Sequence, residues 1–173
     1  MTTIIAMNTP DDQAIYADSL ADGAGIATRG TLKLVSIAPQ CVMGWCGLRY
    51  VGIVAAKILQ KADSLEDVFT QGCFLDRLSF PPDDVKDFSA LVLFQEKIWL
   101  VHEELVPMEL QQPFTARGSG AHFAMGALAA GASAWHALVI ACEYDISTGA
   151  PFFRIGLDGV IRDEKGERQD ASP

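Results

Sequence analysis

The order of strand-like and helix-like segments is the feature that most constrains this fold. Two extended runs, residues 2–7 and 13–18, are joined by Thr-Pro-Asp-Asp, and this turn chemistry predicts a hairpin at the start of the chain. Two further runs, residues 32–38 and 42–47, are separated by Pro39-Gln40 and predict another pair of strands. Strands therefore precede the first helix, and residues 22–30 between the two pairs are expected to form a glycine-rich loop.

The rest of the chain alternates helical and extended patterns. The expected elements are a helix at residues 49–61, a shorter helical stretch from Ser64, strands at residues 90–94 and 98–101, an extended segment to Arg117, paired helices at residues 120–144, and a strand at residues 152–157. This order predicts an α+β layered fold in which antiparallel strands form the centre and two helix pairs cover the outside.

Length and composition indicate one domain. The chain has 173 residues, of which 50% are hydrophobic and 20% charged, enough to bury a core of its own. We expect a single domain over residues 1–161. Residues 162–173 are charged and lack periodicity, so we expect a flexible tail there.

The charge balance excludes two classes of partner. The net charge of -9 would repel the chain from phosphate backbones and anionic lipids, so neither nucleic acid nor a membrane is expected as a partner.

Residues 118–142 lack Lys, Arg, Asp and Glu and are long enough to cross a bilayer. However, His122 and His136 interrupt the stretch, and Gly131-Ala132-Ser133 is typical of a helix end followed by a new N-cap. Two short buried helices fit better than a membrane span.

Neither the cysteines nor the histidines indicate a metal site. Cys41, Cys46, Cys73 and Cys142 form no CxxC pair, which favours reduced thiols and a cytoplasmic location. The apolar start of the chain is too short for a signal peptide. The three histidines are far apart, and no GxxxxGKS phosphate loop is present, so we expect no metal and no cofactor.

Position 2 offers a candidate nucleophile. Methionine aminopeptidases remove Met1 when a small residue follows, so the mature chain is expected to begin with Thr2. The free amine of an N-terminal threonine, with a reference pKa of about 7.7 to 8.0, can act as the general base for its own hydroxyl. Many proteins begin with Met-Thr, and an ordinary N-terminus is the alternative interpretation.

Five short motifs accompany this threonine. They are Thr2-Thr3-Ile4-Ile5-Ala6, Tyr16-Ala17-Asp18-Ser19, Lys33-Leu34-Val35, Gly44-Trp45-Cys46-Gly47 and Gly118-Ser119-Gly120. In this order and spacing, over about residues 2–152, they resemble the proteasome β-subunit family, and in particular the bacterial HslV-type peptidases. The resemblance implies a four-layer αββα sandwich, the fold of N-terminal-nucleophile (Ntn) hydrolases.

The resemblance also implies catalytic roles. Thr2 would be the nucleophile, Lys33 would favour its alkoxide, and Asp18 would hold Lys33 charged and oriented. Ser119 would bind near the threonine amine, and the Gly47 N–H would receive the developing oxyanion. As ordinary structure, the same residues would be a strand-edge lysine, a turn aspartate, a helix N-cap and a strand-to-helix turn.

Two further sets of residues follow from the same resemblance. Asp145 and Thr148 fall where the family supports the nucleophile, with Thr148 at a position where serine is usual; their alternative is a helix end and turn. A substrate pocket would be formed by Thr31, Val35, Trp45 and Arg49. The pair Leu48-Arg49 replaces the usual small residues, so the pocket is expected to be narrow or charged unless Arg49 points into solvent.

The implied function is a threonine peptidase in a self-compartmentalising complex. Its substrates would be proteins or peptides, its assembly a homo-oligomeric ring, and its partner an AAA+ ATPase that unfolds substrates. Two alternatives remain: a catalytically silent scaffold subunit of the same fold, and an Ntn amidohydrolase that acts on a small amide.

Overall fold

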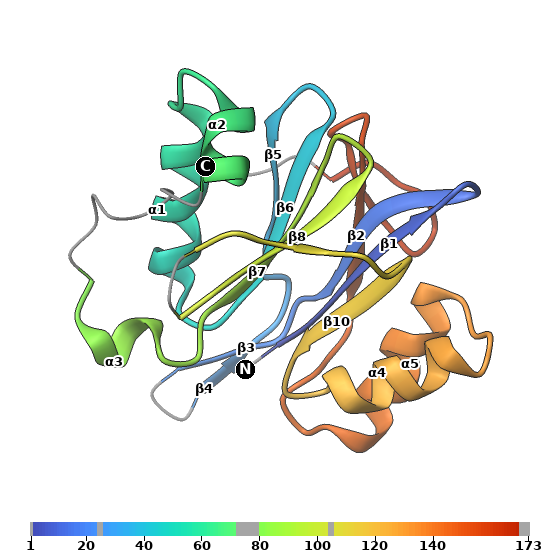
Figure 1. Cartoon of the computed structure of the whole chain (residues 1–173). Helices are drawn as coiled ribbons and strands as arrows, with labels where there is room; N and C mark the ends of the chain where they lie inside the picture. The colour runs from blue at the N-terminus through green and yellow to red at the C-terminus, as the bar shows by residue number, and fades with distance from the viewer. Residues whose placement is uncertain (1, 24–25, 72–79, 104–105, 170–173) are drawn as a thin grey trace.

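Two five-stranded antiparallel sheets form the centre of the protein, which a computed structural model describes over residues 2–23, 26–71, 80–103 and 106–169 (Figure 1). The first sheet has the order β10-β1-β2-β11-β12, with β1 at Thr3–Thr9, β2 at Asp12–Asp18, β10 at Phe114–Gly118, β11 at Phe152–Gly156 and β12 at Ile161–Asp163. The second has the order β5-β6-β7-β8-β9, with β5 at Leu34–Ala38, β6 at Cys41–Cys46, β7 at Ser89–Phe94, β8 at Lys97–His102 and β9 at Met108–Leu110.

Helices cover the outer face of each sheet (Figure 1). Helices α1 (Arg49–Gln60) and α2 (Leu65–Gln71) pack on the second sheet, and helices α4 (Ala121–Ala129) and α5 (Ala134–Tyr144) pack on the first. Three hydrophobic clusters fill the spaces between the four layers. The four-layer αββα sandwich expected from the sequence is therefore confirmed.

Strand alternation explains how a single strand contributes side chains to two hydrophobic clusters. In β1, Ile4 and Ala6 belong to the cluster between the sheets, whereas Ile5 belongs to the cluster beneath α4 and α5. Successive side chains of a strand point to opposite faces, so a sheet that is covered on both faces needs an unbroken apolar run. Residues 4–6 supply such a run.

The uncharged stretch of residues 118–142 forms two short helices, as expected. Ser133 is the N-cap of α5, and its side chain accepts a hydrogen bond from the His136 N–H at 3.3 Å. No helix formed by the described residues has the length and apolarity needed to cross a membrane.

The structure differs from the expected elements in four places. Segments expected to be irregular or merely extended contain the hairpin β3 (Ala21–Gly23) and β4 (Ile26–Thr28), the strands β9 and β10, and the short helix α3 (Pro82–Val85). Strand β12 pairs with β11, and the Gln169 N–H bonds to the Ile161 carbonyl at 2.9 Å. Ordered structure thus continues through much of the segment expected to be a flexible tail. Cys73 and residues 170–173 lie outside the described residues.

Candidate active site

Strand ends meet at one end of the sandwich and gather the candidate catalytic residues there. Strand β1 begins after Thr2, β2 ends at Asp18, and β10 ends at Gly118, which pairs with Thr3. Lys33 immediately precedes β5 in the facing sheet. The register of the strands therefore brings together residues that are far apart in the sequence.

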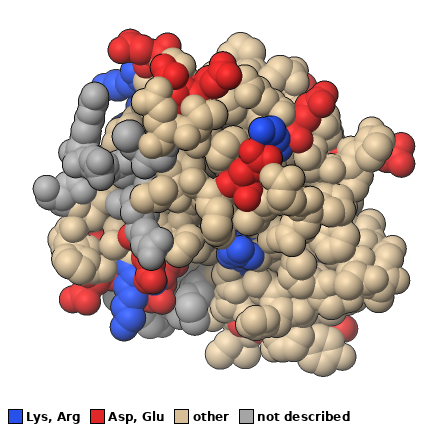
Figure 2. All heavy atoms as spheres, in the orientation of Figure 1, with Lys and Arg blue, Asp and Glu red and all other residues tan. Residues whose placement is uncertain are grey.

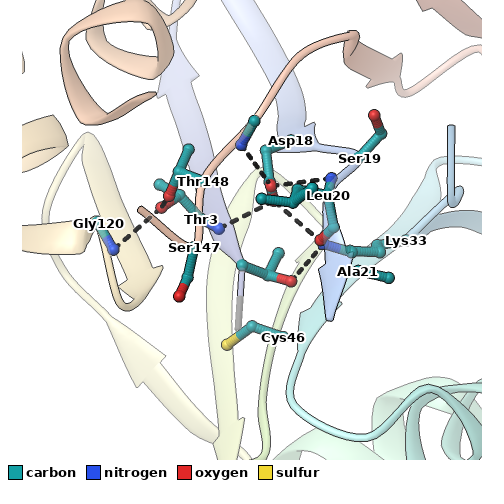
Figure 3. Close-up of polar contacts among 12 residues, drawn as sticks. Thr3, Asp18, Ser19, Leu20, Ala21, Lys33, Cys46, Gly120, Ser147 and Thr148 are labelled. Carbon is teal, nitrogen blue, oxygen red and sulfur yellow. Dashed lines mark hydrogen bonds and ion pairs between the residues drawn. The ribbon is translucent and has the colours of Figure 1, made fainter. Parts of the chain in front are cut away.

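Lys33 contacts Thr2 and Asp18 directly. The Lys33 Nζ donates hydrogen bonds to Thr2 Oγ1, to the Leu20 carbonyl, and to Asp18 Oδ1 at 3.2 Å (Figure 3). Thr2, Lys33 and Asp18 are all buried, with side chains no more than 6% exposed. Three acceptors around one nitrogen match the three N–H donors of an ammonium group.

Asp18 is held by four donors. Its Oδ1 accepts from the Thr3 N–H at 3.0 Å as well as from Lys33, and its Oδ2 accepts from the N–H groups of Leu20 at 3.1 Å and Gly149 at 3.0 Å. Burial raises the pKa of Asp18 overall, although the charge of Lys33 and the hydrogen bonds from Gly149, Thr3 and Lys33 act in the opposite direction. An ionised carboxylate only accepts hydrogen bonds, so a set made up of donors alone fits the charged form.

Burial acts on Lys33 in the opposite sense. Removal of the ammonium from water lowers the pKa of Lys33, and the neighbouring Asp18 carboxylate partly restores it. The site therefore contains an amine that is easier to deprotonate than a surface lysine, in direct contact with the hydroxyl of Thr2.

A second hydrogen-bond network surrounds Asp145 and reaches Thr2 and Thr3. Asp145 Oδ2 accepts hydrogen bonds from Ser119 Oγ and Thr148 Oγ1, both at 2.6 Å. Partial burial raises the pKa of Asp145, but these two donors and the Ser147 N–H outweigh it and lower the pKa overall. The hydroxyl oxygens of Thr148 and Thr3 are 2.6 Å apart, and the Ser119 N–H donates to the Thr2 carbonyl at 3.1 Å.

Two glycines let backbone segments approach the site closely. Gly118 has a φ of +99°, and a Cβ placed on it would lie 1.7 Å from the Thr2 carbonyl oxygen. Gly47 has a φ of +97°, and a Cβ there would lie 2.7 Å from the Asp87 carbonyl oxygen. Both positions require a residue without a side chain.

Thr2 stands between two hollows. One is a cleft of about 590 Å³ that Thr2 lines together with Gly47, Arg117 and Ser119. The other is a pocket of about 210 Å³, whose lining includes Thr31, Lys33, Trp45, Leu48 and Arg49. Gly47 lines both hollows together with Thr2.

Three of the four expected pocket residues lie together. Thr31, Trp45 and Arg49 line the 210 Å³ pocket, which is small for a ligand site. Val35 is not among the residues that line it within the described part of the chain; it packs against the cluster under α1. The reason is strand alternation, because its neighbour Leu34 points into the core between the sheets. The expectation for Val35 is corrected accordingly.

The sequence analysis missed Thr3 and Arg117. Thr3 orients Asp18 through its N–H and contacts Thr148 through its hydroxyl (Figure 3). Arg117 lines the large cleft. Its position directly before the motif Gly118-Ser119-Gly120 was a usable signal.

The described residues bring together no group of three His, Cys, Asp or Glu side chains that could hold a metal ion.

No protein-family model matches the sequence, and no curated sequence is significantly similar to it.

Solved structures do resemble it. Thiobacillus denitrificans BPH in complex with epoxomicin aligns with a TM-score of 0.73 at 20% identity, over 90% of this chain and 99% of that chain. BPH in another structure aligns with a TM-score of 0.70 at 21% identity, over 91% and 98% of the two chains. Eukaryotic HslV from Trypanosoma brucei aligns with a TM-score of 0.62 at 20% identity, over 88% and 97%.

The chain has the HslV fold. The alignments cover most of this chain and nearly all of the solved chains, so the likeness extends over most of the fold. The resemblance inferred from the five motifs is thereby confirmed at the level of the fold, the Ntn-hydrolase sandwich.

Proposed function

We propose that this chain is a threonine peptidase of a proteasome-like, self-compartmentalising complex. The observation that carries the proposal is the contact of the Lys33 ammonium with Thr2 Oγ1, in a buried site that Asp18 completes and that opens into a cleft. A buried ammonium beside a hydroxyl lowers the cost of removing the hydroxyl proton. The HslV fold supports the same function.

The mechanism requires that Met1 is removed, so that Thr2 carries a free amine. That amine accepts the Oγ1 proton, and Oγ1 attacks the carbonyl carbon of the peptide bond. The Gly47 N–H stabilises the resulting oxyanion. When the C–N bond breaks, the α-ammonium returns its proton to the leaving amine and an ester on Thr2 remains. The amine then takes a proton from water, and the resulting hydroxide attacks the ester carbon. The C–Oγ1 bond breaks, and the α-ammonium returns its proton to Oγ1, which regenerates Thr2.

The surrounding residues position these groups. Asp18 compensates the charge of Lys33 and holds it at the hydroxyl. Asp145, Ser119 and Thr148 form the hydrogen-bonded network that fixes the backbone around Thr2 and orients its amine. Thr31, Trp45 and Arg49 form a small pocket for a substrate side chain next to the scissile bond.

The proposal includes an assembly. The substrates are peptides or unfolded proteins that reach Thr2 inside a homo-oligomeric ring. An AAA+ ATPase partner delivers folded substrates, and the complex works in the cytoplasm. The HslV fold supports these partners by analogy.

The test combines the N-terminus with turnover. N-terminal sequencing of the purified protein is expected to begin at Thr2, and internally quenched peptides are expected to be cleaved. Thr2→Ala should abolish cleavage, whereas Thr2→Ser should retain part of it, because serine keeps both the hydroxyl and the amine. Epoxomicin, which BPH binds in its crystal structure, is expected to inhibit cleavage.

Two outcomes would contradict the peptidase. Peptide cleavage by protein that retains Met1 would exclude the Thr2 amine as the base. A mature Thr2 terminus with no cleavage of any peptide would favour a silent scaffold, or an amidohydrolase if small amides are hydrolysed instead.

A further inference from the structure

Arg117 places a cation at the open end of the core between the sheets. It pairs in register with Ile4, whose side chain belongs to that core, so both side chains lie on the same face of the sheet. Arg117 is half-buried and lines the cleft of about 590 Å³ together with Thr2 and Ser119. The cation is therefore part of the wall beside the nucleophile.

The hydrogen bonds of Arg117 use one end of its guanidinium. Its Nη1 donates to Thr115 Oγ1 at 3.2 Å and to the Ala116 carbonyl at 2.8 Å. Thr115 is fully buried, so these contacts hold the guanidinium to the strand. Within the described residues, Nε and Nη2 have no hydrogen-bond partner, and these are the donors that bind a carboxylate in a bidentate manner.

The charge of Arg117 also has no partner among the acidic residues that the structure describes. Among the described residues no carboxylate lies within 4.0 Å of its guanidinium, and burial lowers the pKa of Arg117. Carboxylates outnumber cations in this chain by 22 to 13, so an unpaired arginine in a cleft is not explained by a shortage of acidic partners.

The other charged residues of the cleft cannot take the place of Arg117 as a binding group for an anion. Lys86, Asp87 and Glu103 are exposed at the rim, where water screens their charges, and the two acids outnumber the lysine, so these three residues supply no net positive charge. His102, also at the cleft, is half-buried. A guanidinium that is partly removed from water interacts more strongly with an incoming anion than exposed rim groups do.

The cleft lies on the leaving-group side of Thr2. Lys33 contacts the hydroxyl and lines the smaller pocket, whereas the Thr2 backbone is held against Gly118 and Ser119, which line the cleft. In the proposed reaction the backbone amine returns the proton to the departing amine. The departing part of the substrate therefore lies toward Ser119 and Arg117.

We propose that Arg117 binds a carboxylate in the leaving-group part of the substrate and makes the enzyme selective for it. The carboxylate is an Asp or Glu side chain just after the scissile bond, or the C-terminal carboxylate of a short peptide. This inference rests on the proposed peptidase function and names the substrate class of the same site.

The turnover experiment uses four matched, internally quenched peptides. They carry Glu or Gln after the scissile bond and end in an amide or a free acid, with the cleavage position checked by mass spectrometry. We expect kcat/KM to be about tenfold higher for a peptide with a carboxylate, the value of one charge-assisted hydrogen-bonded pair. Selectivity for Glu assigns the side chain, and selectivity for the free acid assigns the C-terminus.

Variants connect the selectivity to Arg117. In Arg117→Gln the ratio of kcat/KM between peptides with and without a carboxylate should fall to about one. Arg117→Lys, which keeps the charge but loses the fork, should give an intermediate ratio. The matched control is Lys86→Gln, a cation at the rim of the same cleft, which should keep the full ratio.

A binding experiment separates this inference from the peptidase itself. Thr2→Ala protein is titrated with four fluorescent product peptides, which begin with Glu or Gln and end in an amide or a free acid, with and without Arg117→Gln. Tighter binding of a peptide with a carboxylate, by an amount that depends on Arg117, supports the site even if no peptide is ever cleaved. Equal binding of all four peptides, or a preference that survives Arg117→Gln, overturns it.

Discussion

The environment of Lys33 differs strongly from that of a lysine on the protein surface. It is 6% exposed, burial lowers its pKa, and its three hydrogen bonds go to a hydroxyl, a carbonyl and a carboxylate. The Asp18 carboxylate keeps the ammonium form accessible, because removal of that charge would leave a buried cation without compensation. The proposed chemistry depends on this balance.

The pH dependence of turnover follows from two groups. The Thr2 amine must be neutral to accept a proton, so kcat/KM should rise as the pH passes about 8. Lys33 must be charged, so kcat/KM should fall as the pH rises through its pKa, which burial places below that of an exposed lysine. Peptide cleavage measured across this range should give a bell-shaped profile.

Replacement of Lys33 by alanine tests whether catalysis needs the ammonium group. It should lower kcat by several orders of magnitude, as removal of one member of a catalytic unit usually does. A rate that stays constant up to the pH at which surface lysines lose their proton would show that the charge of Lys33 is not required.

A substitution at Gly118 tests the close approach of the backbone to Thr2. Gly118→Ala should displace Thr2 and abolish activity, since the new Cβ would lie 1.7 Å from the Thr2 carbonyl oxygen. Gly131→Ala is the matched control, because Gly131 also has a positive φ, +91°, but has open space around it. The control should cost only about 1 kcal/mol of stability and leave cleavage intact. Equal activities of the two variants would contradict the proposed contact.

At the scale of secondary structure, the sequence predicted the long elements and missed the short ones. The apolar runs of β1, β6 and β7 and the Ser133 cap of α5 carry local signals of their own. Strands β3, β4, β9 and β12 have three residues each, and pairing with neighbouring strands defines them rather than propensity.

The same limit applies to the candidate site. Thr2, Asp18, Lys33 and Ser119 were predictable because the motifs carry them in order, and the structure places all four around one end of the sandwich. Val35 was misplaced because the face of a strand depends on its register with the facing layers. The contacts of Arg117 arise from the geometry of the strand end, which no local pattern specifies.

Two helical glycines should respond in opposite ways to the same substitution. A Cβ on Gly52 of α1 would lie 2.2 Å from the Trp45 Nε1 of β6, so Gly52→Ala should destabilise the protein by about 1 to 3 kcal/mol through overpacking. Gly126 of α4 has nothing within 4 Å of such a Cβ, so Gly126→Ala should stabilise by about 1 kcal/mol. Denaturant unfolding at one fixed protein concentration measures both. A neutral Gly52→Ala would show that α1 does not pack on Trp45 this closely.

On the face of the molecule that Figure 2 shows, charged side chains and apolar surface are separated. Figure 2 shows acidic side chains distributed over much of the visible face, whereas the region of α4 and α5 is largely without charge. On and after these helices, Phe123, Val139, Tyr144 and Ile146 are 40%, 45%, 67% and 98% exposed. Exposed apolar surface of this kind is typical of surfaces that bind another protein chain.

This surface leads to the prediction that the native protein is an oligomer. Light scattering coupled to size exclusion should give a mass several times the 18.6 kDa of one chain. Ile146→Glu should shift the population toward smaller species, because it places a charge where a neighbouring copy would exclude water. Lys61→Gln, at an exposed position just after α1, lowers the net charge by the same amount and should leave the assembly intact. A native protein that elutes at the mass of one chain would remove the proposed chamber, because isolated copies of this fold cannot enclose a proteolytic space.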